Sequence, residues 1–343
     1  MATEAADARV IVPDLDFSRT VPKDLVHREA LSELFLTDSR KMTDGHFMAA
    51  AQIPPSHAYY TDHTDRSPID PLLLLECCRQ AETHAVHAHF GAPRNTVFIL
   101  QSWSMRLPGA ATARIGPGPA ELIMDVTTRD SRWRDGTLLA TTYVMRLSVA
   151  GQYLGEVSLR AAYMPGGTYA AMRTRRRGST PPTSDAFRHL RVGTPVPPGQ
   201  VGRTREENVV LLDAVTGPDG VSARLRPAGE HPSLFDHPLD HFPGMVLMEA
   251  GRQLGLLHAA EHAAEHTHDG DRPWALTELA ASFQTYAELD SPLLLTARRS
   301  SRHEPDADGE LRLSIAFEQG EQLVAEADIA LTRAQRPTPE DAP

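Results

Sequence analysis

A ten-residue pattern occurs twice in this 343-residue chain, and it restricts the possible folds more than any other feature. Residues 71–80 read PLLLLECCRQ, and residues 244–253 read GMVLMEAGRQ. Each copy has an apolar run followed by Glu, two small residues, Arg and Gln, and the offset from Glu76 to Glu249 is 173 residues. Two copies separated by about half of the chain predict a duplicated domain.

The segments around each copy follow one order. Short alternating runs such as ENVVLLDAV precede the copy, and several β-like runs such as LRLSIAFEQ follow it. One long apolar helix and a mostly antiparallel sheet, repeated twice, indicate an α+β architecture. We expect a first repeat over 20–164, a Pro-, Gly- and Arg-rich interdomain linker over 165–202, a second repeat over 203–333 and a disordered tail over 334–343.

Composition excludes several classes of protein. Hydrophobic residues make up 41% and charged residues 23% of the chain, which is typical of a globular protein. The net charge of −11 argues against general nucleic-acid binding, and no apolar run reaches the length of a membrane span. The first residues lack the basic start of a secretory signal. The adjacent Cys77 and Cys78 cannot form a structural disulfide, so we expect a cytoplasmic protein.

The two expected helices, 71–89 and 244–266, each carry three polar residues at positions i, i+3 and i+4, on one helix face. These residues are Glu76, Arg79 and Gln80 in the first helix, and Glu249, Arg252 and Gln253 in the second. One interpretation is a buried structural ion pair repeated by duplication. The other is a catalytic or substrate-binding pair, because burial raises the pKa of a carboxylate and makes it a usable base.

A polar loop precedes each helix. The first contains His57, Asp62, His63, Asp65 and Asp70, and the second contains His231, Asp236, His237, Asp240 and His241 before Pro243 and Gly244. The spacing matches no familiar zinc pattern, so we expect no metal. A loop histidine beside a helix glutamate suits general acid–base chemistry. The helix start near Gly244 offers free N–H groups for a carbonyl oxygen or a phosphate.

These motifs carry a family resemblance. The string FDHPLDHFPGMVLMEA resembles the signature of the β-hydroxyacyl-ACP dehydratases, which are hotdog proteins. The chain is more similar to the A-factor synthase (AfsA) family through LVHREALSELFLTD, AAAQIPPSHAYY, DPLLLLECCRQA and FDHPLDHFPGMVLMEAGRQ, in that order from about 20 to 333. This resemblance implies a tandem hotdog fold, with one long helix wrapped by an antiparallel sheet in each half.

The resemblance also implies an activity. Members of the family join a β-ketoacyl group, carried on acyl carrier protein, to the hydroxyl of dihydroxyacetone phosphate, and the ester closes to a phosphorylated butenolide in γ-butyrolactone biosynthesis. No cofactor is implied, and the chain would be a monomeric pseudo-dimer or a homodimer. Two alternatives stay open: a hydro-lyase or thioesterase acting on acyl-ACP, and a non-catalytic binder of small molecules.

The resemblance pairs each loop histidine with the helix glutamate of the other half, so that His57 faces Glu249 and His237 faces Glu76. Expected catalytic residues are therefore Glu76, Glu249, His57 and His237. Expected substrate-binding residues are Arg79, Arg252, Gln80, Gln253, Asp240, His241 and Gly244. His57 and Glu76 are seven residues further apart than His237 and Glu249, and Leu72 stands where a Gly is expected. We therefore expect one active cleft, and favour the one with Glu76, Arg79 and the 236–241 loop.

Three further sequence features bear on the site. Cys77 and Cys78 correspond to Ala250 and Gly251, which favours packing over nucleophilic catalysis. The stripe His258, His262 and His266 is typical of a solvated helix end. Arginines 173, 175, 176, 177, 188 and 191 form either a flexible linker or a docking patch for the acidic acyl carrier protein.

Overall fold

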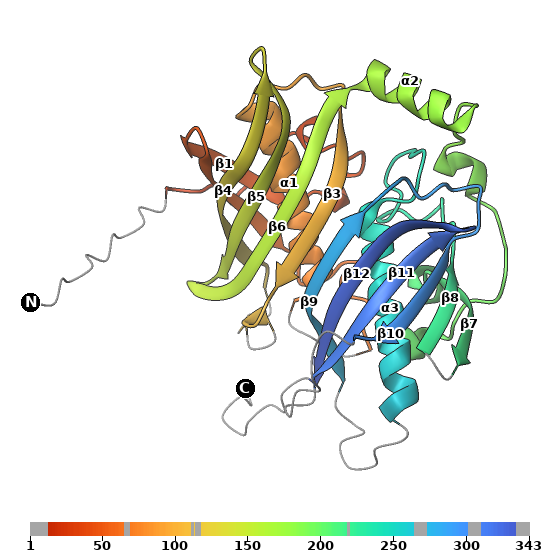
Figure 1. The fold of residues 1–343 in the computed structure, drawn as a ribbon. Coiled ribbons are helices and arrows are strands. Elements are labelled where there is room, and N and C mark those ends of the chain that lie inside the picture. Colours follow the sequence, from red (N-terminus) through yellow and green to blue (C-terminus); the bar gives the residue numbers. More distant parts are fainter. Residues whose placement is uncertain are drawn as a thin grey trace, which may run out of the picture.

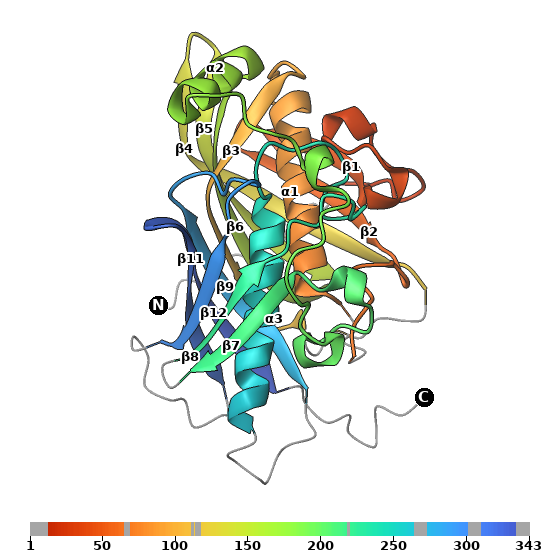
Figure 2. The ribbon, with the colours of Figure 1, turned by 90° about the vertical axis from the view of Figure 1, so that its right-hand side faces the viewer.

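A computed structural model describes residues 13–64, 69–110, 113, 118–217, 220–263, 273–300 and 310–333. Within these ranges twelve strands form one antiparallel sheet that wraps around two long helices, α1 and α3 (Figure 1). The two helices contact each other on one face of the sheet (Figure 2). The described part of the chain contains no helix that is both long and apolar enough to cross a membrane.

The two halves have the same order of elements. The first half contains β1 (Leu36–Thr43), β2 (His46–Ile53), α1 (Pro71–Ala88), β3 (Thr96–Arg106), β4 (Ala120–Arg134), β5 (Thr137–Val149) and β6 (Gln152–Pro165). The second contains β7 (Leu211–Gly217), β8 (Gly220–Leu225), α3 (Gly244–Ala263), β9 (Trp274–Phe283), β10 (Leu294–Arg299), β11 (Leu311–Gln319) and β12 (Gln322–Arg333). The predicted α+β duplication is therefore confirmed.

The strand order is symmetric about the centre of the sheet. It runs β1-β2-β4-β5-β6-β3 and then β9-β12-β11-β10-β8-β7, so each half contributes its own six strands. The halves join where β3 pairs antiparallel with β9, from Ser102 opposite Ser282 to Arg106 opposite Glu278. The two repeats thus form a pseudo-dimer with a continuous sheet inside one chain.

Helix α1 begins where the sequence places a strong start signal. Asp70 is its N-cap and accepts a hydrogen bond from the Leu72 N–H at 2.8 Å, and Pro71 occupies the first helical position. Residues Leu72–Leu75 are buried, as are the polar residues Glu76 and Gln80. Because α1 is covered on nearly all sides, its polar residues need partners inside the protein.

The segment between the repeats contains helix α2 (Gly166–Arg177), which differs from the irregular linker that its composition suggested. Arg173 is buried and pairs with Asp240 and Glu288, while Arg177 pairs with Glu288 and Asp290. These ion pairs join α2 to the second repeat. Short 3-10 turns follow at Ser184–Phe187, Pro198–Val201 and Glu206–Asn208, and two more, Lys23–Leu25 and Leu31–Glu33, precede β1. The tail 334–343, His266 and the His262 side chain lie outside the described residues.

Candidate functional site

Glu76 lies at the centre of a buried ion cluster in the first half. Its side chain is 0% exposed, and its Oε1 accepts hydrogen bonds from Arg28 Nη2 at 2.6 Å and Arg79 Nη2 at 2.9 Å. Arg79 Nε donates to Oε2 at 2.8 Å, and Gln80 Nε2 donates to Oε1 at 2.7 Å. One carboxylate is therefore held by two guanidinium groups and one amide.

The second half repeats this cluster around Glu249. Arg203 Nη2 donates to Oε1 at 2.9 Å, Arg252 Nη2 donates to Oε2 at 2.6 Å, and Gln253 Nε2 donates to Oε1. The helix residues Glu249, Arg252 and Gln253 were predicted from the repeat, whereas Arg28 and Arg203 were not. The similar strings VHREALSELF and VGRTREENVV, which each carry an arginine, are the signal that could have revealed them.

The two glutamates are poor candidates for a free base. Burial raises the pKa of Glu76, but the charges of Arg28 and Arg79 outweigh burial and lower it to about 2. The pKa of Glu249 is likewise lowered, because Arg203 and Arg252 outweigh burial. The expectation that burial makes these carboxylates basic is therefore wrong: paired arginines reverse the sign of the shift.

Gln80 and Gln253 hold the backbone rather than facing open space. Gln80 Oε1 accepts the N–H groups of Phe35 and Leu36, and its Nε2 donates to Glu33 O as well as to Glu76. Gln253 accepts the Val210 N–H and donates to Asn208 O. Both are fully buried, which differs from the substrate-binding role expected for them.

The structure shows that the two polar loops align differently from the alignment expected from the sequence. His57 Nδ1 accepts the N–H groups of the residues two and three positions later, and His231 Nδ1 does the same. Asp62 and Asp236 each accept two backbone N–H groups from the opposite half. His57 thus corresponds to His231 and not to His237. Counted from His57 and His231, the spacing to the helix glutamate differs by one residue between the two repeats. The seven-residue difference came from aligning His57 with His237. By the corrected alignment Pro71, rather than Leu72, corresponds to Gly244.

The expected pairing of His57 with Glu249 is not found. His57 Nε2 lies 3.3 Å from Glu33 Oε1, so both ring nitrogens engage other groups. His237 Nδ1 lies 3.5 Å from Asp236 Oδ2, while both oxygens of Glu76 accept from Arg28 and Arg79. Each of these histidines therefore lies beside a carboxylate other than the helix glutamate expected for it.

A cavity of about 900 Å³ opens beside the first cluster. One wall comes from α1 and the segment before β1, including Arg28, Arg79 and Glu82. The opposite wall is the 233–245 loop with the start of α3, including His237, Asp240, His241 and Gly244. The structure thus brings Arg79, His237, Asp240, His241 and Gly244 together, as the favoured cleft required. Glu76 lies behind the two arginines, and His57, Glu249, Arg252 and both glutamines lie outside this lining.

The loop that closes this cavity is held by α2. Asp240 accepts hydrogen bonds from Tyr169 OH at 2.9 Å and Arg173 Nε at 2.9 Å, and lies 2.6 Å from His241 Nδ1. A Cβ on Gly244 would lie 2.8 Å from Leu100 Cδ2, so this helix start packs closely against β3. The loop and helix start are therefore fixed against the first repeat.

The two clusters differ in charge. Arg252 Nη1 lies 3.4 Å from Asp70 Oδ2, so the second cluster has two carboxylates for two guanidinium groups. The residue corresponding to Asp70 is Pro243, because each precedes the first helical residue and accepts the same backbone hydrogen bonds. Proline brings no counterion, so the first cluster keeps one positive charge in excess.

The clusters also differ in open space. Tyr59, from the loop before α1, is buried beside the second cluster, and its ring lies under Arg203, with 4.4 Å from Cζ to the ring centroid. Its counterpart Ser233, from the loop before α3, lies beside the first cluster and lines the cavity. Arg28 and Arg79 are 10% and 21% exposed, whereas Arg203 and Arg252 are 0% and 6% exposed. The structure therefore leaves the first cluster accessible and closes the second.

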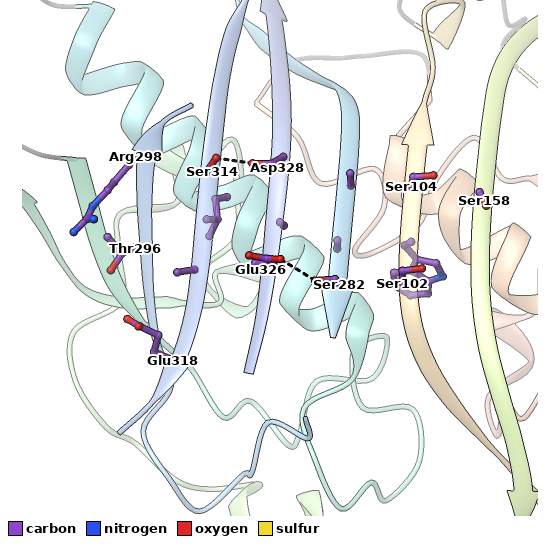
Figure 3. A pocket seen from close by; sticks show the side chains of 16 residues that line it. Ser102, Ser104, Ser158, Ser282, Thr296, Arg298, Ser314, Glu318, Glu326 and Asp328 are labelled. Atoms are coloured by element: carbon purple, nitrogen blue, oxygen red, sulfur yellow. Dashed lines mark hydrogen bonds between the residues drawn. The ribbon is translucent and has the colours of Figure 1, made fainter. Parts of the chain in front are cut away.

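Two other candidates do not form a site of this kind. A hollow of about 600 Å³ lies on the sheet face away from the helices, where Ser314 pairs with Asp328 and Ser282 with Glu326 (Figure 3).

Cys77 and Cys78 are fully buried, and burial raises their pKa, which fits packing. In the ranges that the structure covers, no three His, Cys, Asp or Glu side chains are arranged to hold a metal ion.

Comparison with known proteins places this arrangement in a family. The family model for the A-factor biosynthesis hotdog domain matches residues 11–165 and 185–334. A protein named 2-oxo-3-(phosphooxy)propyl 3-oxoalkanoate synthase from Streptomyces virginiae is 35% identical over 279 residues, covering 81% of this chain and 87% of the relative. A protein of the same name from Streptomyces griseus subsp. griseus is 32% identical over 295 residues, covering 86% and 85%.

Among solved structures, the 12:0-ACP thioesterase from Umbellularia californica is similar with a TM-score of 0.43 and 8% identity, covering 83% of this chain and 94% of that one. The family model matches both repeats, and the identity to the Streptomyces relatives extends over most of the chain. This chain belongs to the A-factor biosynthesis hotdog family, as its motifs indicated.

Proposed function

We propose that this chain is an acyltransferase that joins a β-ketoacyl group to a hydroxyl of dihydroxyacetone phosphate. The observation that carries the proposal is the match of both repeats to the family, with relatives named 2-oxo-3-(phosphooxy)propyl 3-oxoalkanoate synthase. That name describes an ester of a 3-oxoalkanoic acid with dihydroxyacetone phosphate. Its methylene lies between two carbonyls, so condensation onto the ketone closes a phosphorylated butenolide, as in γ-butyrolactone biosynthesis.

The excess positive charge of the first cluster supports binding of the phosphate. Arg28 and Arg79 line the cavity and share the single carboxylate of Glu76. Guanidinium groups bind phosphate oxygens through charge-assisted hydrogen bonds, and a site with limited water strengthens this attraction. We assign the phosphate of the acceptor to these two arginines, with Glu76 holding them in place.

The apolar part of the cavity suits the acyl chain. Side chains from β3, the loop before α3 and α3 itself line it, among them Phe98, Leu100, Phe242, Met245 and Leu247. A cavity of this size with an apolar wall and a few polar groups is typical of small-molecule sites. The acyl chain would extend along this wall, with its thioester end near the arginines.

The start of α3 can stabilise the oxyanion that forms when the hydroxyl attacks the thioester. In α1 the N-cap Asp70 satisfies the Leu72 N–H, whereas Pro243 has no side-chain acceptor for the corresponding Met245 N–H. Gly244 and Met245 both line the cavity. A backbone donor in this position contributes about 3 kcal/mol to stabilising an oxyanion.

We assign the acyl donor to acyl carrier protein and its docking to helix α2. Arg175 and Arg176 are exposed on α2, and Arg176 also lines the cavity. The neighbouring Arg173 and Arg177 pair with carboxylates of the second repeat, which fixes the helix. An acidic carrier would bind here by charge complementarity, with its acylated arm entering the cavity.

Transfer is tested by incubating the purified protein with a β-ketoacyl-ACP and dihydroxyacetone phosphate. Mass spectrometry is expected to detect the phosphorylated ester or the butenolide, together with free carrier thiol. Thiol release without dihydroxyacetone phosphate would indicate a thioesterase and would refute the proposal. Binding of either compound without any turnover would instead indicate a small-molecule binder.

A further inference from the structure

Beyond Arg79 the cavity reaches a second acidic residue of α1. Glu82 lines the cavity and is 2% exposed. Its Oε1 accepts a hydrogen bond from Tyr163 OH at 2.8 Å, and its Oε2 accepts one from Thr83 Oγ1 at 3.2 Å. The Tyr163 hydroxyl in turn lies 3.1 Å from the Tyr143 hydroxyl. Glu82 thus sits in a network of neutral hydroxyl groups.

Within the described residues Glu82 forms no ion pair, which distinguishes it from the other acids of the cavity. Within the described lining, Asp24 pairs with Arg94, Glu29 with Lys23, and Asp240 with Arg173. The hydrogen bonds of Glu82 come from hydroxyls alone. Burial therefore prevails and raises the pKa of Glu82 to about 7, against the opposing effects of the Tyr163 hydroxyl, the Arg79 charge and the Thr83 hydroxyl. Such a carboxyl can both take and return a proton near neutral pH.

The second repeat lacks this group. Gly255 of α3 corresponds to Glu82, and a Cβ on Gly255 would lie 2.5 Å from Ile329 Cδ1, so apolar side chains of the sheet pack directly against this position. Thr83 likewise corresponds to Leu256. The repeats share the Glu, Arg and Gln of the buried cluster, but at this helix position an ionisable residue stands in α1, beside the cavity, and glycine stands in α3.

A neighbouring residue shows the same specialisation. His27 lines the cavity and has a φ of 51°, while its counterpart Gly202 has a φ of 72°. A histidine in this left-handed conformation is strained where glycine is not. His27 Nε2 lies 2.9 Å from His87 Nε2, and His87 Nδ1 lies 3.0 Å from Ala92 O. Since His87 Nδ1 must donate to this carbonyl, His27 donates to His87 and keeps its own Nδ1 as an acceptor.

The position of Glu82 fits the acceptor substrate assigned to Arg79. The two residues are three positions apart on α1, a rise of about 4.5 Å along the helix axis. The Arg79 and Glu82 side chains start from backbone positions this close, so a three-carbon phosphate ester is long enough to reach from one to the other. An acceptor whose phosphate is held at Arg79 can therefore place its free hydroxyl near Glu82.

We propose that Glu82 is the acid–base residue of the acyl transfer, an inference that rests on the proposed function. The Glu82 carboxylate takes the proton of the acceptor hydroxyl as its oxygen forms the new C–O bond to the thioester carbon. The tetrahedral intermediate then breaks its C–S bond, and Glu82 returns the proton to the departing sulfur, which leaves as a thiol. The carboxylate is regenerated, and no other reactant is consumed.

The test compares Glu82→Gln with Glu29→Gln, a matched change at an exposed carboxylate of the same cavity. Glutamine keeps the shape of Glu82 but cannot carry the proton, so kcat is expected to fall about 10²–10⁴-fold with little change in KM for dihydroxyacetone phosphate. The wild-type rate should rise with pH through a pKa near 7. In Tyr163→Phe this pKa should move upwards, because the Tyr163 hydroxyl lowers it. If Glu82 had only a structural role, Glu82→Gln would not lower kcat selectively and Tyr163→Phe would not shift the pKa of the rate.

A rival base is tested in the same series. His241 also lines the cavity, with Nδ1 2.6 Å from Asp240 Oδ1, so His241→Gln is included. If Glu82→Gln keeps the wild-type kcat and pH profile, the role of Glu82 is refuted while the transfer stands. If the wild type forms no ester, the transfer itself is refuted, and the role of Glu82 with it. Infrared spectra should also show a protonated carboxyl that titrates near pH 7 and disappears in Glu82→Gln; its absence in the wild type refutes the proposal.

Discussion

Relative to the wild type, Glu82→Gln is expected to become more stable as the pH rises. Burial raises the pKa of Glu82 from 4.5 to about 7, so the folded state prefers the protonated carboxyl. The stability that this preference contributes is fully present below pH 4.5 and is lost as the pH rises through about 7. Each pKa unit corresponds to about 1.4 kcal/mol, so the full loss is about 3 kcal/mol. Glutamine does not titrate and escapes this loss.

The assay is urea unfolding of the wild type and Glu82→Gln at pH 5 and pH 8. The free energy of unfolding of the variant, relative to the wild type, should increase by about 2–3 kcal/mol between these values. At pH 5 Glu76 stays ionised, because its arginines lower its pKa to about 2, so the buried cluster is intact throughout.

Glu76→Gln serves as the opposite case. It should destabilise the protein at both pH values by about 3–5 kcal/mol, because it leaves Arg28 and Arg79 without their carboxylate. An unchanged difference between Glu82→Gln and wild type from pH 5 to pH 8 would refute the reasoning about burial. It would mean that the nearby charge of Arg79 and the hydroxyls of Tyr163 and Thr83 offset the effect of burial on Glu82.

Three further changes test the asymmetry of the clefts. Ser233→Tyr introduces into the open cavity the kind of side chain that Tyr59 provides at the second cluster, so transfer should be lost while the melting temperature is retained. A variant that keeps its transfer activity would show that the reaction takes place outside this cavity. Pro243→Asp gives the first cluster the counterion that Asp70 supplies to the second cluster, so KM for dihydroxyacetone phosphate should rise about 10-fold, a cost of about 1.4 kcal/mol. An unchanged KM would exclude phosphate binding at the first cluster. Glutamate in place of both Arg175 and Arg176 should raise KM for β-ketoacyl-ACP and spare short thioester mimics; equal effects on both donors would exclude docking on α2.

The fold could be predicted from the sequence because the strongest signals are local and occur twice. The apolar run before Glu76 and its repetition before Glu249 locate both helices, and alternating runs locate the strands. The symmetric sheet follows once two such units must share their edges. Helix α2 was missed because its polar sequence gives no apolar stripe; its stability comes from the buried ion pairs of Arg173 with distant residues.

The site was harder to predict, because its chemistry depends on contacts between distant segments. The sequence marks Glu76 and Arg79 as unusual in an apolar helix, but the sign of the pKa shift of Glu76 depends on Arg28, which lies 48 residues earlier. The loop register was misjudged because several histidines and aspartates are nearly interchangeable in one dimension. Only the backbone hydrogen bonds of His57 and His231 identify them as counterparts.

Duplication explains why similar clusters can have different tasks. A buried Glu held by two arginines costs desolvation and yields little net stability unless its hydrogen bonds are complete. At the second cluster Asp70 completes the charges and Tyr59 fills the space, and both residues come from the first repeat. Arg203 also donates to the backbone carbonyls of Tyr59 and Asp62, so this cluster joins the two repeats. At the first cluster Pro243 and Ser233 of the second repeat leave charge and space available, which a structural cluster would not require. The same polar framework therefore stabilises the pseudo-dimer on one side and leaves a cavity lined by Arg28, Arg79 and Glu82 on the other.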